Sequence, residues 1–387
     1  MRVLFTSLRN TGHFQPLVPF IEACLARGHE VAVGAPAELT EQVVRSRAQF
    51  FPVGHPGDAG LGPIWARMRA ASEADAVRLV IEEVFAGACA EHALPALCAA
   101  VEQFRPDLLV REAQEYAAVI AAEKLGLPHA RVAISLAESQ LFLWSRPALE
   151  RHRAALGLAS DPEGRALRNE PTFSRFPCSF DVEAGEPGIL HRFRASLPSH
   201  PPLSFTWSDA SVPLVYLTLG TVTGSTTHIQ GVYRTVLDAV ADLPLRVLLT
   251  TGAELPPETL GAVPPHVQVA RFVPQDQVLP EARAVVCHGG SGTVLGALAH
   301  GVPMVVVPLF ADQPQNAERV EAIGAGIQVP RPASAPAIRA ALSRVLAEPA
   351  FKASALHVRD EIAALPSIDQ APLAFEQIAR EASRPRA

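Results

Sequence analysis

The chain has 387 residues, of which 49% are hydrophobic and 19% charged, and its formal net charge is −6. These values predict a globular α/β protein long enough for two domains, and the lack of a basic tract argues against a nucleic-acid partner. The five cysteines are scattered without metal-ligand spacing, so neither a disulfide framework nor a zinc site is expected, which suits a reducing cytoplasm. The first apolar run is too short for a signal peptide, and no apolar span of about 18 residues predicts a membrane helix.

The amino-terminal half alternates short apolar runs with helical segments, which is typical of a parallel sheet covered by helices. Strands are predicted at residues 3–6, 29–34, 49–53, 108–110 and 129–134, and helices at 14–27 and 116–125. Residues 64–104 are largely helical in pattern, whereas the glycine- and proline-rich residues 54–63 predict a loop. The first βα turn lacks G-x-G-x-x-G, which argues against an NAD enzyme.

Large apolar side chains before residue 176 are candidates either for a ligand pocket or for the core. Trp65, Met68 and Phe85 fall within the helical pattern, where a role in the core is the simpler interpretation. A second group, expected to be exposed, is Phe142, Trp144 and Phe173.

Polar side chains follow two of the predicted strands at their carboxyl ends. His13 lies in the first βα turn, and Glu112 and Glu115 follow the strand at 108–110. In a doubly wound sheet these ends meet at one edge, where ligand crevices form. On position alone, an exposed or helix-capping histidine and solvated carboxylates at a helix start are the simpler interpretations.

The carboxyl-terminal half restarts the α/β alternation after residues 196–213, whose four prolines and several serines predict an interdomain linker. The strands predicted there are 214–219, 245–250, 267–270, 284–287 and 304–307, and the helices are 229–241, 294–299, 338–348 and 372–382.

Between two of these strands lies the motif HGGSGT, residues 288–293. Its three glycines let the backbone turn sharply and approach a ligand closely. Ser291 or Thr293 is expected to cap the helix that follows, and Gly301 to end it. The amino terminus of that helix offers free N–H groups and a positive dipole end to a phosphate, and His288 offers a further donor.

A carboxylate and a carboxamide, Asp312 and Gln313, follow the next strand. Side by side beyond the carboxyl end of a strand, they suit bidentate contacts with sugar hydroxyls. A diphosphate cradle followed by such a pair fits a nucleotide-sugar. The alternative is an ordinary glycine-rich turn followed by a polar helix start.

HGGSGT and the following ALAHGVPMVVVPLFADQPQNAERV resemble the donor-binding signature of GT-B glycosyltransferases, specifically the bacterial natural-product members related to plant UDP-sugar transferases. The resemblance extends from the amino-terminal GHFQP to ADQPQNA. It implies two Rossmann-like, doubly wound α/β domains that face each other across a cleft containing the active site. The expected divisions are an acceptor-binding domain at 1–195 with its last strands in 176–194, a linker at 196–213, a donor-binding domain at 214–370, and a final helix at 371–387 that packs back on the first domain.

The resemblance also implies roles for single residues. GHFQP is similar to the family's GH-x-x-P, whose histidine, here His13, is the general base, and a neutral imidazole suits that task at neutral pH. Glu112 matches the acidic residue that orients this histidine, although Asp is commoner there, and Glu115 is the alternative. Residues implied to hold the nucleotide-sugar are Gly220, Thr221, Phe272, Val273, Gln275, His288, Gly290, Ser291, Gly292, Thr293, Asp312 and Gln313.

Two positions differ from the plant relatives. Phe272 stands where those relatives usually have Trp; it can still stack on a pyrimidine, and its alternative is a core aromatic. Gly296 stands where a Glu binds the ribose hydroxyls. Without that carboxylate a ribose loses a hydrogen-bond partner for its 2′-hydroxyl, whereas a 2′-deoxyribose loses less, so the change favours a TDP-sugar. A glutamate at position 296 is expected to be compatible with the helix backbone.

The expected activity is inverting, metal-independent transfer of a (deoxy)sugar from a TDP-sugar to a hydroxyl, or a nucleophilic carbon, of a small apolar acceptor such as a polyketide or macrolide. No Asp-x-Asp metal signature occurs, so the nucleotide-sugar co-substrate is the expected requirement, without a metal or cofactor. The alternatives are UDP-glucose as donor, a nucleotide-sugar epimerase, and a non-catalytic nucleotide-sugar-binding helper. The protein is expected to be a cytoplasmic monomer or homodimer.

Overall fold

The computed structural model describes residues 1–136, 138–181, 190–196, 205, 207, 211–220, 227–252 and 255–383. The chain forms two compact units, and the first consists of the segments Met1–Arg175, Glu183–Ser196 and Pro366–Ala387. The second comprises Phe176–Val182 and Leu197–Leu365. Most of the expected linker, residues 196–213, lies outside the described residues.

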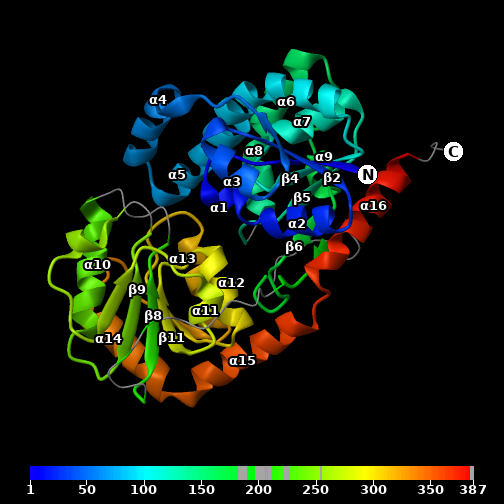
Figure 1. The fold of residues 1–387 in the computed structure, drawn as a ribbon. Helices are drawn as coiled ribbons and strands as arrows, with labels where there is room; N and C mark the ends of the chain where they lie inside the picture. Colours follow the sequence, from blue (N-terminus) through cyan, green and yellow to red (C-terminus); the bar gives the residue numbers. More distant parts are fainter. Residues whose placement is uncertain are drawn as a thin grey trace. The chain divides into compact units, whose positions relative to one another are not determined.

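The first unit is built on a parallel sheet with the strand order β3-β2-β1-β4-β5-β6-β7 (Figure 1). Its strands are β1 (Arg2–Thr6), β2 (Glu30–Ala35), β3 (Gln49–Pro52), β4 (Leu108–Glu112), β5 (His129–Val132), β6 (Thr172–Ser174) and β7 (Leu190–Arg192). The order reverses between β1 and β4, which pair in parallel with Phe5 beside Val110. In a doubly wound sheet this reversal is where a ligand crevice forms.

Helices cover both faces of the first sheet because alternate strand residues are apolar on each side. The helices of this unit are α1 (Thr11–Phe14), α2 (Val18–Ala26), η1 (Ala37–Leu39), α3 (Thr40–Arg45), α4 (Gly57–Ala70), α5 (Glu73–Leu79), η2 (Val80–Cys89), α6 (Ala90–Phe104), α7 (Ala117–Leu125), α8 (Glu138–Leu156), α9 (Arg165–Arg168), η5 (Ile368–Gln370) and α16 (Ala371–Ala382). Leu4 and Leu109 pack against α6, α7 and α8, while Val3 and Phe5 pack against α2 and α16.

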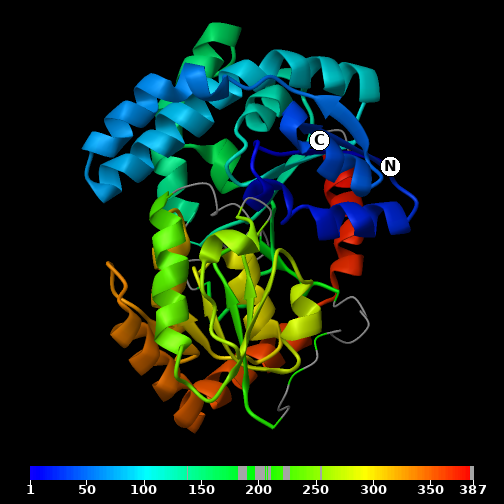
Figure 2. The ribbon, with the colours of Figure 1, turned by 60° about the vertical axis from the view of Figure 1, so that its left-hand side comes forward.

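The last helix, α16, lies against α2 in the first unit (Figures 1 and 2). Phe375 of α16 is fully buried, and its ring centroid lies 4.3 Å from that of Phe173 and 6.1 Å from that of Phe5. The prediction that Phe173 is exposed was therefore wrong, since Phe173 faces the core that α16 completes.

Local composition misled two predictions in this unit. The helix expected at 14–27 is divided into α1 and α2 by a turn that contains Pro16, which has no N–H to donate. Residues 54–63 are not a loop throughout, because α4 begins at Gly57 and continues through Pro63. Burial of Leu61, 2% exposed, against the apolar residues of η2 offsets the weak helix propensity of this segment.

Helix η2 is a π-helix, a rare form that often occurs at functional sites. Together α5, η2 and α6 make one helical run, Ala74–Phe104, that within the described residues is long and apolar enough to cross a membrane by length and composition alone. The expectation that no such span exists was too strict. However, 56% of its most apolar window is buried inside the protein, as in the core helix of a globular domain.

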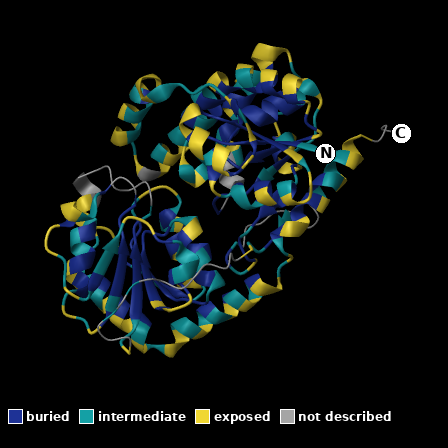
Figure 3. Cartoon of the chain, in the orientation of Figure 1, coloured by how far each residue is buried: buried dark blue, intermediate teal, exposed yellow. Residues whose placement is uncertain are grey.

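The second unit contains a parallel sheet with the order β10-β9-β8-β11-β12-β13, reversing between β8 and β11. The inner strands of this sheet are buried, whereas the two outer strands are partly exposed (Figure 3). The strands of the sheet are β8 (Leu214–Thr218), β9 (Arg246–Thr250), β10 (Val267–Ala270), β11 (Ala282–Cys287), β12 (Met304–Val306) and β13 (Gly326–Gln328).

Two helices, α10 (Thr227–Val240) and α14 (Ala335–Ala347), pack on one face of the second sheet. The remaining helices are η4 (Pro257–Leu260), α11 (Gln275–Val278), α12 (Ser291–Ala299), α13 (Gln313–Ala322) and α15 (Pro349–Ala364). Helix α15 was not predicted. Residues 176–194 supply one described strand to the first sheet, whereas Phe176–Val182 belongs to the second unit, where Arg319 of α13 donates hydrogen bonds to the carbonyls of Ser179 and Phe180.

Candidate active site

The first group of predicted site residues lies at the strand-order reversal of the first sheet. His13 belongs to α1, which follows β1, and Glu112 is the last residue of β4. His13 Nδ1 and Glu112 Oε1 are 3.0 Å apart, and Nδ1–H donates to the carboxylate. In neutral imidazole this tautomer leaves Nε2 unprotonated, so that Nε2 can accept a proton.

Glu112 is held firmly in this orientation. Its side chain is fully buried, and its two oxygens also accept hydrogen bonds from the N–H groups of Leu8, at 3.4 Å, and Gln114, at 2.8 Å. The His13 side chain is 14% exposed, so solvent or a substrate can reach it. A buried carboxylate aligned by backbone donors fixes the ring orientation of a histidine.

The alternative carboxylate, Glu115, makes a different set of bonds. It accepts hydrogen bonds from Thr6 Oγ1 at 2.7 Å and from the N–H groups of Ala117 and Ala118 at 2.9 and 3.2 Å. Burial raises its pKa, against the effect of the Thr6 hydrogen bond. Glu115 therefore stabilises the first turn of α7, and the structure pairs His13 with Glu112.

Sequence reasoning missed the ion pair beneath this dyad. Arg111, fully buried, makes a bidentate bond to Glu170 at 2.6 and 2.8 Å and donates to the Ala113 carbonyl at 2.6 Å. Burial alone would raise the pKa of Glu170, but Arg111 and His129 outweigh it and lower the pKa to about 2. The signal was a charged residue directly after the apolar run Leu108–Val110, because a charge buried in a strand requires a partner.

An apolar wall adjoins His13. The Phe85 ring, from η2, meets the imidazole edge to face at 5.4 Å between centroids. Phe85 and Trp65 are half-buried and pack on the cluster of Leu8, Leu61, Val84 and Cys89. Neither these two residues nor Met68 is fully buried, so their side chains retain surface that an apolar acceptor could contact.

The second group of predicted residues lies at the strand-order reversal of the second sheet. Gly220 follows β8, and His288 to Thr293 follow β11 and start α12. Thr221 lies outside the described residues. A Cβ at Gly220 would lie 2.8 Å from His288 Nε2, and one at Gly290 would lie 2.5 Å from the same atom. Both glycines are therefore required for close packing around the imidazole, whatever the ligand.

The His288 side chain is buried at this reversal. Burial lowers its pKa from the ordinary value near 6.5 to about 4, although a hydrogen bond with the Thr218 backbone opposes the shift. His288 is therefore neutral at pH 7 and carries no positive charge.

This pKa predicts a pH-dependent stability. Because His288 has a lower pKa folded than unfolded, the unfolded state takes up a proton first as the pH falls below about 6.5, and stability is lost between there and about 4. The free energy of unfolding, from denaturant titration, is expected to fall by roughly 2 kcal/mol from pH 7.5 to 5 through this residue. His288→Asn should remove that part of the pH dependence. Identical pH profiles for the two proteins would contradict the expectation.

The glycine-rich loop begins α12 without a side-chain cap. Gly290 is the N-cap residue, so the prediction that Ser291 or Thr293 caps the helix was wrong. Ser291 Oγ instead donates to Asp312 Oδ2 at 2.7 Å, and Thr293 Oγ1 accepts from Gln275 Nε2 at 3.0 Å. Within the described residues the N–H groups of Gly290, Ser291 and Gly292 have no hydrogen-bond partner, which leaves three donors at the positive end of the helix.

Asp312 and Gln313 already make internal hydrogen bonds. Asp312 Oδ2 accepts from Ser291 and from Asn316, and Gln313 Oε1 accepts from the N–H groups of Leu309 and Phe310 at 2.8 and 3.0 Å. These bonds fix the turn between β12 and α13. Sugar recognition by this pair remains a prediction, and both side chains already accept hydrogen bonds within the protein.

The segment expected to hold the nucleobase presents an aromatic ring to solvent. Phe272 is 68% exposed, so the alternative of a core aromatic was wrong, while Val273 is 7% exposed. A Cβ at Gly296 would lie 3.1 Å from Gln275 Oε1 and 3.3 Å from Leu279 Cδ1. The expectation that a glutamate suits position 296 thus holds for the backbone, but the Gln275 side chain must shift to admit it.

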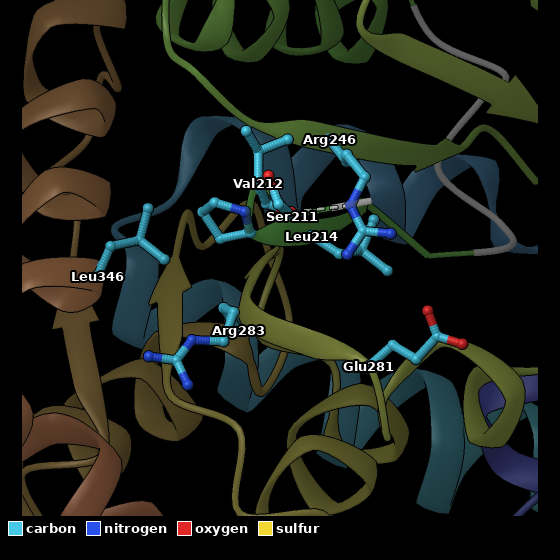
Figure 4. Close-up of a pocket in the computed structure, with 8 residues that line it drawn as sticks. Ser211, Val212, Leu214, Arg246, Glu281, Arg283 and Leu346 are labelled. Atoms are coloured by element: carbon cyan, nitrogen blue, oxygen red, sulfur yellow. Dashed lines mark hydrogen bonds between the residues drawn. The ribbon is translucent and has the colours of Figure 1, made fainter. Parts of the chain in front are cut away.

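A cavity of about 420 Å³ in the second unit lies elsewhere. It is lined by Ser211, Val212, Pro213, Leu214, Arg246, Glu281, Arg283 and Leu346 (Figure 4). Leu214 and Arg246 begin β8 and β9, so the cavity is at the amino ends of these parallel strands, opposite the glycine-rich loop. Arg246 Nε donates to the Val212 carbonyl across it at 2.8 Å. None of the predicted site residues lines this cavity.

Comparison with known proteins matches both halves of the chain. Residues 22–166 match the erythromycin biosynthesis protein CIII-like amino-terminal domain, and residues 234–372 match the carboxyl-terminal domain of the same family. A 3-alpha-mycarosylerythronolide B desosaminyl transferase from Saccharopolyspora erythraea is 30% identical over 100% of both chains. The TDP-daunosamine transferase of Streptomyces peucetius is 29% identical over 98% of this chain and 97% of its own.

Solved structures agree with these relatives. The glycosyltransferase VinC in complex with dTDP has a TM-score of 0.77 and 27% identity, covering 98% of this chain and 100% of its own. A spinosyn rhamnosyltransferase has a TM-score of 0.81 and 24% identity, covering 97% and 100%. The two doubly wound sheets and these matches define a glycosyltransferase of the GT-B fold, as predicted. Within that class, the chain belongs to the erythromycin biosynthesis protein CIII-like family.

Proposed function

We propose that this glycosyltransferase moves a deoxysugar from a TDP-sugar to a hydroxyl of a small apolar acceptor such as a polyketide or macrolide, with inversion at the anomeric carbon. The observation that carries the proposal is the His13–Glu112 dyad at the strand-order reversal of the first sheet. The half-buried apolar wall beside His13 suits an apolar acceptor. Relatives named as a desosaminyl and a TDP-daunosamine transferase support this class of donor and acceptor.

The dyad would act as the general base. His13 Nε2 takes the proton of the acceptor hydroxyl as its oxygen forms a bond to the anomeric carbon, and the bond from that carbon to the diphosphate breaks. Glu112 stabilises the imidazolium that results. A single displacement from the face opposite the leaving group inverts the configuration.

The second unit would stabilise the leaving nucleoside diphosphate. The three N–H groups at the start of α12 would donate hydrogen bonds to the diphosphate, and the positive end of the helix dipole would stabilise its developing negative charge. We infer that these groups serve where other transferases use a metal ion, so that no metal is needed.

Acceptor-dependent release of TDP tests this function. Purified protein with a TDP-sugar and a panel of polyketide alcohols should release TDP only when an acceptor is present, and the rate should persist in EDTA. Release without acceptor, with an altered sugar, would indicate an epimerase. Binding without turnover would indicate a helper protein, and loss of activity in EDTA would disprove the metal-free mechanism.

Nucleotide preference is the next prediction. The residue at 296 is glycine, so the structure offers no carboxylate there to a ribose 2′-hydroxyl, and a buried unpaired hydroxyl costs about 1–3 kcal/mol. TDP, taken as the 2′-deoxy nucleotide, is therefore expected to bind roughly tenfold more tightly than UDP in calorimetric titrations. Gly296→Glu should narrow the gap once Gln275 has shifted. If the wild type binds UDP as tightly as TDP or more tightly, the donor is a UDP-sugar instead of a TDP-sugar.

A further inference from the structure

One buried side chain in the second unit connects the glycine-rich loop to Asp312. Asn316, on α13, is fully buried. Its Nδ2 has two hydrogens and three acceptors within reach, the Gly289 carbonyl at 2.8 Å, Asp312 Oδ2 at 2.9 Å and Ser291 Oγ at 3.1 Å. Ser291 Oγ in turn donates to Asp312 Oδ2 at 2.7 Å. These four residues form a hydrogen-bonded cluster, and no role for Asn316 was predicted from the sequence.

The orientation of the Asn316 amide is determined by its neighbours. The Gly289 carbonyl and the Asp312 carboxylate only accept hydrogen bonds, so the NH₂ group must face them. Asn316 Oδ1 is then buried with no hydrogen-bond partner among the described residues. A buried acceptor without a partner costs free energy, so the donor side of the amide must be the side that the site requires.

The bond to Gly289 also orients a ligand-facing group. In a trans peptide the C=O and the following N–H point in opposite directions. When Asn316 holds the Gly289 carbonyl toward the interior, the Gly290 N–H is directed away from that interior. Gly290 N–H is one of the three donors at the start of α12 without a partner in the described part of the chain.

We infer that Asn316 is a positioning residue that couples the diphosphate-binding loop to Asp312, so that the phosphate and sugar portions of the donor are recognised together. This inference rests on the proposed function. Through its bond to the Gly289 carbonyl, the Asn316 amide orients the Gly290 N–H toward the diphosphate. Through its bond to Asp312, the same amide fixes the carboxylate that contacts the sugar. Losing the amide therefore weakens both contacts, and it weakens binding of the nucleotide-sugar more than binding of the nucleotide alone.

Asn316→Asp is the sharpest test, because the shape is kept while both amide donors are replaced by an acceptor. Calorimetric titration of TDP and TDP-glucose is expected to show TDP bound at least tenfold more weakly than by the wild type, with a larger loss for TDP-glucose. Ser291→Ala should weaken binding in the wild type but add little in the Asn316→Asp background, since coupled residues give non-additive effects. A purely structural asparagine would lower the melting temperature without changing the ratio of the two affinities.

The controls separate the possible failures. Asn169→Asp makes the same chemical change at an exposed residue of the first unit and should leave both affinities unchanged. If Asn316→Asp does not fold, Asn316→Ser, which retains one hydroxyl donor, takes its place with an intermediate loss expected. Affinities within twofold of wild type in a folded variant, or additive effects with Ser291→Ala, would overturn the inference alone. Failure of the wild type to bind TDP would overturn the proposed function instead.

Discussion

His13→Ala is expected to lower the turnover of glycosyl transfer to an aliphatic alcohol by roughly 10²–10⁴-fold, the usual contribution of a general base. The imidazole is partly exposed, and its Nδ1–H donates to a buried carboxylate, so Nε2 is the basic atom of the ring. The affinity for TDP should not change, because His13 belongs to the first unit and the glycine-rich loop to the second. Turnover measured under saturating donor, together with a TDP titration, checks both statements. An acidic phenol serves as the control acceptor, since it ionises without a base and should be affected much less.

Substitution of Glu112, the carboxylate partner of His13, tests the same assignment. Glu112→Gln should lower turnover in the same direction, and the double variant should be little worse than His13→Ala alone, because residues that act as a unit are not additive. Glu115→Gln changes a carboxylate only three positions away that stabilises the start of α7. It is expected to change the melting temperature more than the turnover. The assignment of the dyad fails if Glu115→Gln is the more damaging to turnover, or if His13→Ala transfers sugar to an aliphatic alcohol at a near-normal rate.

Gly292→Val is expected to weaken TDP binding by on the order of 100-fold, through the loss of charge-assisted hydrogen bonds worth about 1.5–3 kcal/mol each. Gly292 is the second residue of α12, and no atom lies within 4 Å of the position that its Cβ would take. The Cβ of the new side chain therefore has open space in the ligand-free protein, and we expect the side chain to collide with a bound diphosphate. Calorimetry with TDP measures the effect, and thermal unfolding should show a melting temperature close to that of the wild type.

The choice of position decides what this experiment can show. Gly290→Val would push directly against the His288 ring, so a loss of binding there would not distinguish a disturbed loop from a blocked ligand. Gly231→Val provides a matched control, because Gly231 is also an exposed helical glycine with open space around its Cβ. TDP binding by a folded Gly292→Val protein with unchanged affinity would mean that the loop is structural only.

Much of the fold could be predicted from the sequence because buried parallel strands are short continuous apolar runs. The segments around Val3, Leu109, Val215 and Val286 were all found in this way, and each is a central strand of its sheet. Once those strands are placed, residues at their carboxyl ends must share one edge of the sheet. That rule put His13 on the same edge as Glu112 and Glu115, and the structure confirms that His13 lies beside Glu112. The resemblance assigned Gly220 and His288 to the nucleotide-sugar, and the structure places these two residues next to each other.

The remaining features depend on contacts that local sequence does not encode. The α4 helix forms through a proline because Leu61 is buried by η2, and Phe173 is buried by a helix about 200 positions later in the sequence. At the site, sequence identified Asp312 and Ser291 as polar groups but could not tell that they bond to each other. The i, i+4 spacing of Asp312 and Asn316 was the available signal, because residues so spaced share a helix face.

The three-segment composition of the first unit has a consequence for biosynthesis. Phe375 and its neighbours in α16 fill the core beneath Phe5 and Phe173, yet they leave the ribosome only after the whole second unit. Until then the emerging first unit exposes an apolar face. Each phenylalanine that stays unburied withholds roughly 1.5–3 kcal/mol of stabilisation from the fold. The second unit consists of Leu197–Leu365 and the short segment Phe176–Val182, both of which are synthesised before α16. It can therefore fold while the first unit is still incomplete. Pairing across so long a sequence separation is slow, and the nascent first unit is therefore the species most exposed to aggregation and to chaperone binding.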